Sequence, residues 1–121
     1  MSLQLITFKH TNTEVRPNLQ DLVTQKLQTI DRFLSAKGEV KCDVEFAKVS
    51  PKLHGAIYRV EVNIWTGGTV YRAEATEETF ERAIEEVRSE LESTLKHSRT
   101  KRQSLWRKGA RKMKDMMRFG S

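Results

Sequence analysis

Three stretches of the chain alternate hydrophobic with polar residues, which is the pattern of strands that bury one face. They span residues 40–46, 56–64 and 70–75. The pair Gly67–Gly68 lies between the last two stretches and predicts a two-residue hairpin turn, because both glycines can take positive φ. A shorter hydrophobic run, Leu3–Phe8, predicts a further strand near the start of the chain.

Two other stretches repeat hydrophobic residues every three or four positions, which indicates helices that each bury one stripe. The first follows Pro17, a residue that suits the first turn of a helix, and we expect it to run to about residue 36, before Gly38. The second is expected from residue 77 to near residue 98, with Thr76 as its N-cap. Its hydrophobic stripe consists of Phe80, Ala83, Ile84, Val87, Leu91 and Leu95.

The expected order of elements is therefore βαβββα. Because each strand buries one face and each helix buries one stripe, both helices should cover the same face of a four-stranded sheet. The predicted fold is a two-layer α+β sandwich with a basic C-terminal tail. The open face of this sheet would carry Arg59, Glu61, Asn63, Trp65, Arg72 and Glu74.

The charge of the chain is distributed unevenly along its 121 residues, a length that suits one domain. The net charge is +6, but residues 1–95 carry 12 Lys/Arg against 15 Asp/Glu, whereas residues 96–121 carry 10 against one. A mildly acidic body followed by a strongly basic end favours binding to a polyanion, since such an end is attracted to phosphates. The alternative is a solvated tail that serves solubility.

Catalytic and metal-binding motifs are missing from the sequence. No serine or cysteine lies in a nucleophile motif, no glycine-rich phosphate loop occurs, and His10, His54 and His97 lie in separate segments without a neighbouring cysteine. We therefore expect a protein that is not an enzyme and takes no cofactor or metal. The single Cys42 excludes an intrachain disulfide. Together with the lack of a secretory signal or an apolar run of membrane-spanning length, it indicates a cytoplasmic protein.

Candidate phosphate-binding residues gather at the end of the second predicted helix and beyond it. The first cluster has few acids near it and exceeds what helix capping needs; it consists of Lys96, His97, Arg99, Lys101 and Arg102. A second group lies among Trp106, Ala110, Met113 and Met117, which recur at helical spacing, and consists of Arg107, Lys108, Arg111 and Lys112. As a basic amphipathic helix, this second group suits RNA, an anionic membrane or a partner groove; alternatively, it stays disordered until it meets RNA.

Three cations within the predicted helices have competing interpretations. Lys26 lies off the hydrophobic stripe of the first helix, either as a solvated lysine or as an RNA contact. Arg82 and Arg88 are candidates for RNA binding, but nearby glutamates at helical spacing also suit intrahelical ion pairs.

The chain also resembles a known family, the ribosome hibernation promoting factors, also called ribosome-associated inhibitors or sigma-54 modulation proteins. The resemblance covers residues 1 to about 101 and rests on the βαβββα order and on the segment AEATEETFERAIEEVRSELESTLKHSRTK. Its most specific part is the junction between the last strand and the second helix, which here reads Thr79-Phe80-Glu81-Arg82-Ala83-Ile84-Glu85.

The resemblance implies a ribosome-binding α+β domain over residues 1–101 and a basic tail over residues 102–121. Family members bind the small ribosomal subunit, chiefly through rRNA, in the channel of mRNA and tRNA, and thereby silence idle ribosomes. It further implies a monomer when free, with no small-molecule substrate and no membrane partner. Two alternatives stay open, a general RNA- or DNA-binding module and an adaptor that the basic tail anchors to a membrane or partner.

The chain also departs from the family pattern at positions that commonly carry a cation. Glu90 and Ser93 stand where relatives often have a lysine and an arginine in the second helix, and Gln20 and Thr29 replace an arginine and a lysine in the first. Lys26 is kept. Several expected phosphate contacts are thus missing from the body of the chain, and the basic end is expected to compensate.

Overall fold

The computed structural model describes residues 5–34, 40–50 and 55–98. A second long helix begins at residue 80 and reaches residue 98, where the described part of the chain ends. The other elements, in chain order, are β1 (Leu5–Thr11), α1 (Pro17–Gln28), the 3-10 helix η1 (Asp31–Phe33), β2 (Lys41–Lys48), β3 (Tyr58–Thr66) and β4 (Thr69–Glu77).

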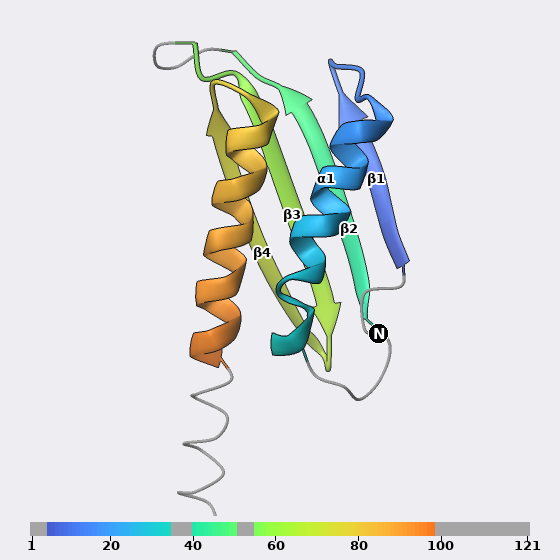
Figure 1. Ribbon diagram of the computed structural model, residues 1–121, viewed down its shortest axis with the longest axis vertical. Coiled ribbons are helices and arrows are strands. Elements are labelled where there is room, and N and C mark those ends of the chain that lie inside the picture. The colour runs from blue at the N-terminus through green and yellow to red at the C-terminus, as the bar shows by residue number, and fades with distance from the viewer. Residues whose placement is uncertain (1–4, 35–39, 51–54, 99–121) are drawn as a thin grey trace, which may run out of the picture.

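The four strands form one mixed sheet in the order β1-β2-β3-β4. The β1–β2 pair is parallel because α1 crosses between these strands, whereas β2–β3 and β3–β4 are antiparallel. Figure 1 shows both helices on the same face of the sheet, α1 nearer β1 and β2, and the second helix nearer β4. The predicted two-layer α+β sandwich and its βαβββα order are confirmed.

The core lies between the sheet and the two helices. Alternate residues of β2 and β3 point into it, and the second helix contributes its hydrophobic stripe at full burial. Ala73 on β4 and Ala83 on the helix are both buried, and their small side chains let the helix approach the sheet closely. The ring of Phe80 packs edge-on against Phe46 and Tyr58, with centroids 5.4 and 4.9 Å away, and this closes the core at the helix start.

The first helix is shorter than its hydrophobic pattern predicts. It ends at Gln28 instead of near residue 36, and the single 3-10 turn η1 follows. The Thr29 hydroxyl donates a hydrogen bond of 2.6 Å to the Lys26 carbonyl, a local bond that competes with continuation of the helix. The helical spacing continues past this break because Ile30 and Phe33 remain buried against the same core. Gly38 lies outside the described residues.

The second helix begins later than predicted, and Thr76 is not its cap. The strand β4 continues to Glu77, and Thr76 pairs with Arg59 of β3. The cap is Thr79, whose hydroxyl accepts a hydrogen bond of 3.1 Å from the Arg82 backbone N–H. Two threonines three positions apart both suit a cap, and strand pairing decides between them.

The first strand is also displaced from its predicted position. It runs over Leu5–Thr11 instead of Leu3–Phe8, and it is followed by Asn12 in the left-handed region with φ 57°. The first four residues of the chain lie outside the described part. Parallel pairing with β2 extends the strand over polar residues that its hydrophobic run did not indicate.

Candidate nucleic-acid interface

The open face of the sheet is occupied by a network of ion pairs centred on Arg59. Its guanidinium donates a 2.6 Å hydrogen bond to Glu61, contacts Glu74, and lies 3.5 Å from Glu45. The Nε atom of Arg72 lies 3.1 Å from the other oxygen of Glu61. The predicted composition of this face is thus confirmed, and its arginines are engaged by carboxylates from three strands.

This network neutralises the open face. Burial alone would raise the pKa of Glu61, but hydrogen bonds from Asn63 and Arg59 outweigh it and leave the pKa below its ordinary value. The strand register places four basic and four acidic residues on this face: Lys9, Lys41, Arg59, Arg72, Asp43, Glu45, Glu61 and Glu74. With equal numbers of both signs, the face has no excess of positive charge to attract a polyanion.

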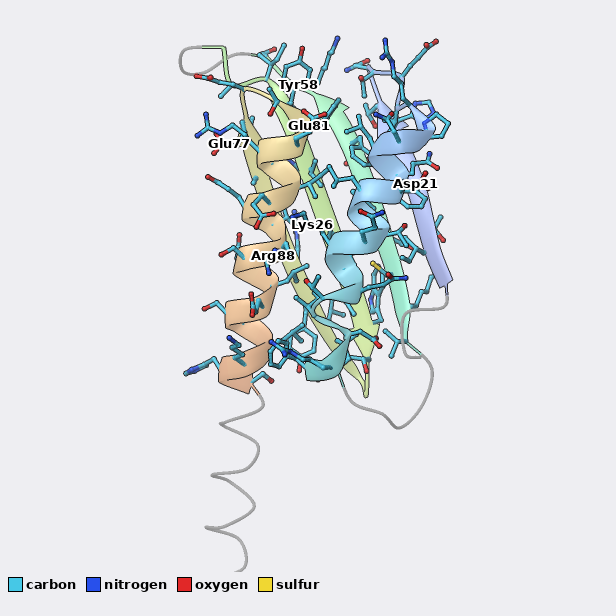
Figure 2. The ribbon with its side chains drawn as sticks, viewed as in Figure 1. Asp21, Lys26, Tyr58, Glu77, Glu81 and Arg88 are labelled. Atoms are coloured by element: carbon cyan, nitrogen blue, oxygen red, sulfur yellow. The ribbon has the colours of Figure 1, made fainter. Side chains whose placement is uncertain are left out.

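The helix face has a different arrangement, in which a carboxylate links the two helices. Glu85 of the second helix lies with one oxygen 2.8 Å from Lys26 Nζ of α1. Its other oxygen accepts hydrogen bonds from Nε and Nη2 of Arg88, at 3.1 and 2.9 Å. Figure 2 shows Lys26 and Arg88 between the two helices. Below them, hydrophobic side chains leave a cavity of about 10 Å³, so the floor of this contact is closely packed.

The same chain of charges continues along the second helix. Nη1 of Arg88 donates a hydrogen bond of 2.8 Å to Glu92, and the other oxygen of Glu92 lies 3.2 Å from Lys96 Nζ. We call these five residues, Lys26, Glu85, Arg88, Glu92 and Lys96, the helix seam. It aligns three cations over both helices, with two carboxylates between them, and so has a net charge of +1.

Ion pairing holds the two carboxylates and the guanidinium of the helix seam in their charged forms. Lys26 first, and Arg88 second, hold the pKa of Glu85 below its ordinary value. The pKa of Glu92 is lowered in the same way, by Lys96 and then Arg88. Hydrogen bonds to Glu85 and Glu92 raise the pKa of Arg88. The pKa shifts of Glu85, Glu92 and Arg88 therefore all favour the charged form of the group.

The seam ends beside an aromatic ring that carries a further cation. The ring of Phe33 in η1 has Arg32 at 4.7 Å and Lys96 Nζ at 5.4 Å from its centroid. The side chain of His97 is exposed one residue further along. Sequence reasoning missed Arg32, because it lies 64 positions before Lys96. The sequence did offer one indication of its role, because Arg32 directly precedes Phe33 at the end of the first hydrophobic stripe.

The structure thus brings together some of the predicted binding residues and separates others. Lys26, Arg88 and Lys96 share the helix seam, and each is paired with a carboxylate. The guanidinium of Arg82 lies 3.9 Å from Glu78 and takes no part in the seam. The remaining candidates lie outside the described residues: Arg99, Lys101, Arg102, Arg107, Lys108, Arg111 and Lys112.

The outer flank of the second helix is acidic. Glu90 and Ser93 line an open hollow with Glu86, about 490 Å³ in volume. A hydrogen bond with Glu77 raises the pKa of Glu86, because two like charges meet there. This flank repels phosphates, so the helix seam and the end of the second helix are the basic parts of the helix layer.

Other kinds of site find no support in the described part of the chain. Within residues 5–34, 40–50 and 55–98, no three His, Cys, Asp or Glu side chains are grouped to hold a metal ion. None of the helices that the structure describes is long and apolar enough to cross a membrane. Burial raises the pKa of the Cys42 thiol to about 12, so this cysteine is a core residue.

Comparison with known proteins gives a consistent result. The family described as sigma 54 modulation protein / S30EA ribosomal protein matches residues 6–103. Among solved structures, the N-terminal domain of Protein Y from Thermus thermophilus is 25% identical, with a TM-score of 0.62 over 80% of this chain and 98% of that one. A ribosomal subunit interface protein from Coxiella burnetii is 17% identical, with a TM-score of 0.65 over 80% and 99%. The search of curated proteins finds no match.

Proposed function

The chain belongs to the sigma 54 modulation / S30EA ribosomal protein family, and from this membership we propose that it is a ribosome hibernation factor. It binds the small ribosomal subunit, chiefly through rRNA, and blocks the path of mRNA and tRNA. The Coxiella burnetii protein of the same fold is described as a ribosomal subunit interface protein, which agrees with this role. The family is one of ribosome-associated factors and not of enzymes, so the proposal involves no catalysis, cofactor or small-molecule substrate.

The observation that carries this proposal is the asymmetry between the two faces of the molecule. Both faces carry ion pairs, but only the helix face aligns its cations in one row, in which Lys26, Arg88 and Lys96 follow one another and Arg32 lies at the end of the seam. A row of cations is suited to successive phosphates of an RNA backbone. We therefore assign the helix face as the side that contacts rRNA.

The basic end of the chain adds to this surface. Residues 1–98 carry 13 Lys/Arg against 15 Asp/Glu, a net of −2, whereas residues 99–121 carry nine against one, a net of +8. Most of the electrostatic attraction to a polyanion must come from this end. We propose that residues 1–101 form the ribosome-binding unit, that residues 102–121 form a basic tail that orders on RNA, and that the protein acts as a monomer in the cytoplasm.

Sedimentation with purified ribosomal particles tests the proposal directly. The full-length chain should migrate with small subunits and whole ribosomes in a sucrose gradient at moderate salt. In a purified translation assay it should lower protein yield, and excess mRNA with initiator tRNA should restore the yield. Undiminished translation at saturating protein would refute the blocking role. Equal binding to unrelated RNA would favour a general nucleic-acid-binding module, and flotation with anionic vesicles would favour a membrane adaptor.

A further inference from the structure

The Glu85 carboxylate holds its two partners in the geometry of a phosphate contact. One oxygen faces Lys26 Nζ at 2.8 Å, and the other accepts two hydrogen bonds from the Nε–Nη2 edge of Arg88. We infer that Glu85 stands in for an RNA backbone phosphate, which displaces it and binds between Lys26 and Arg88. This inference rests on the proposed function and names the site on the helix face where one phosphate is held.

The chemistry of the two cations supports the substitution. The edge of a guanidinium recognises carboxylates and phosphates through the same parallel N–H donors, and a lysine ammonium adds a point charge to either anion. A phosphate has two non-bridging oxygens, so it satisfies Lys26 and Arg88 together as the two carboxylate oxygens do. The two cations come from different helices, and the packed hydrophobic floor below them fixes their spacing.

Glu85 is also free to leave. Its side chain is 48% exposed and belongs to an exposed helix surface, where an ion pair is worth only about 0.2–1 kcal/mol. By contrast, Glu61 on the sheet face is 16% exposed and is held by Arg59, Arg72 and Asn63, so displacement there would leave a half-buried network unpaired. A rotation of the Glu85 side chain into solvent breaks no backbone contact.

Glu92 has a different role in the same seam. It binds the opposite edge of Arg88, through Nη1, and its side chain is 24% exposed. With Glu92 in place, the guanidinium keeps its orientation when Glu85 leaves, and the Nε–Nη2 edge stays turned toward the phosphate. Glu92 is therefore a positioning residue, and Glu85 is the competitor of the RNA.

The test compares Glu85→Gln with Glu86→Gln in the full-length chain. Both variants remove one negative charge from adjacent positions of the same helix, but only Glu85 is ion-paired with Lys26 and Arg88. Binding to purified small subunits is measured at constant salt, and urea unfolding checks that each variant is folded. Glu85→Gln should tighten binding about two- to fivefold, because the RNA phosphate no longer has to break an exposed ion pair, which is worth about that factor. Glu86→Gln should tighten binding by less.

Further variants separate the inference from the proposed function. Lys26→Ala and Arg88→Ala should each weaken binding, and Glu92→Gln should not strengthen it. Equal gains from Glu85→Gln and Glu86→Gln would show that net charge alone acts, and would overturn the inference. Normal binding by Lys26→Ala and Arg88→Ala would overturn it too, while the ribosome role stands. If the full-length chain does not bind subunits, the proposed function fails, and a short RNA duplex as probe then tests the phosphate site with the same variants.

Discussion

The hydroxyls of Tyr71 and Ser98 share a hydrogen bond of 2.9 Å that ties the second helix to β4. Tyr71 is buried and lies shortly after the Gly67–Gly68 turn, and Ser98 is the last residue of the helix that the structure describes. The bond therefore holds Ser98 near the hairpin end of the sheet, about one turn of helix beyond Leu95, where the hydrophobic stripe ends.

Replacing Tyr71 with Phe should loosen this end of the helix without disturbing the core, because the ring remains. We expect the free energy of unfolding to fall by about 0.5–1.5 kcal/mol, the usual contribution of a hydrogen bond, and amide exchange to quicken in the last turn. Urea denaturation and hydrogen exchange measure the two effects. Tyr58→Phe is the matched control, since the Tyr58 hydroxyl has no hydrogen-bond partner among the described residues. Equal losses from both variants would contradict the prediction.

Arg59 should be the most important charged side chain for stability on the open face. Its removal by Arg59→Ala leaves the carboxylate of Glu61, which is 16% exposed, without its main partner. We expect a loss of about 1.5–3 kcal/mol in the free energy of unfolding, the range for hydrogen bonds to charged groups. Arg72→Ala removes a side chain that is 58% exposed and should cost under about 1 kcal/mol. If Arg59→Ala and Arg72→Ala lowered the free energy of unfolding by similar amounts, Arg59 would not be the main stabilising residue of the network.

The effect of Arg59 should depend on pH in a defined direction. The folded pKa of Glu61 is lowered from its ordinary value of 4.5, so its contribution to stability is present above that value and is lost as the pH falls further. The stability difference between the wild type and Arg59→Ala should therefore be constant near neutrality and shrink below about pH 4.5. A difference that stays unchanged through the acid range would indicate a packing effect of the arginine stem instead.

The two layers of this fold were predictable because the hydrophobic periodicities of its strands and of its helices are both strong. The alternation in the strands and the three-to-four spacing in the helices each extend over many residues, so one residue that departs from the pattern does not change the predicted element. The ends of helices and strands depend on individual hydrogen bonds. Thr79 caps the helix in place of Thr76 because Thr76 pairs with Arg59 of β3, and the local sequence around Thr76 does not reveal this pairing. Likewise, the Thr29 hydroxyl bond that accompanies the end of α1 leaves the hydrophobic spacing intact.

The candidate site was predictable only in part, for a related reason. The ion pairs of Arg88 with Glu85 and Glu92 lie within one helix and follow from spacing alone. The pairing of Lys26 with Glu85 joins residues 59 positions apart, and it appears only when the helices pack side by side. The meeting of Arg32 and Lys96 over one ring has the same cause, since it depends on tertiary packing.

Cys42 should be unreactive in the folded protein. It is fully buried on β2, and burial raises the pKa of its thiol to about 12, so almost no thiolate forms at pH 8. A thiol reagent such as iodoacetamide should label it only after unfolding, and its labelling rate should report the opening of the core. Rapid labelling under native conditions, without loss of helix content, would show that β2 opens locally.

Removal of the chain after Gln103 should separate folding from binding. The hydrophobic stripe of the second helix ends at Leu95 and the Tyr71–Ser98 bond is retained, so the truncated protein should unfold at the same urea concentration. It lacks six Lys/Arg and one Asp of the full chain, and we expect ribosome affinity to fall at least about tenfold, or roughly 1.4 kcal/mol.

For each phosphate that the shortened protein no longer binds, the slope of log K against log salt should also flatten by about 0.7–0.9. Ordering these residues on RNA costs about 1–2 kcal/mol each in backbone entropy, so their contacts with RNA must be extensive. Equal affinity of the truncated and full-length proteins at the same salt would reject a role of the tail in ribosome binding. In that case the helix seam and the cluster before Gln103 would account for all of the net binding.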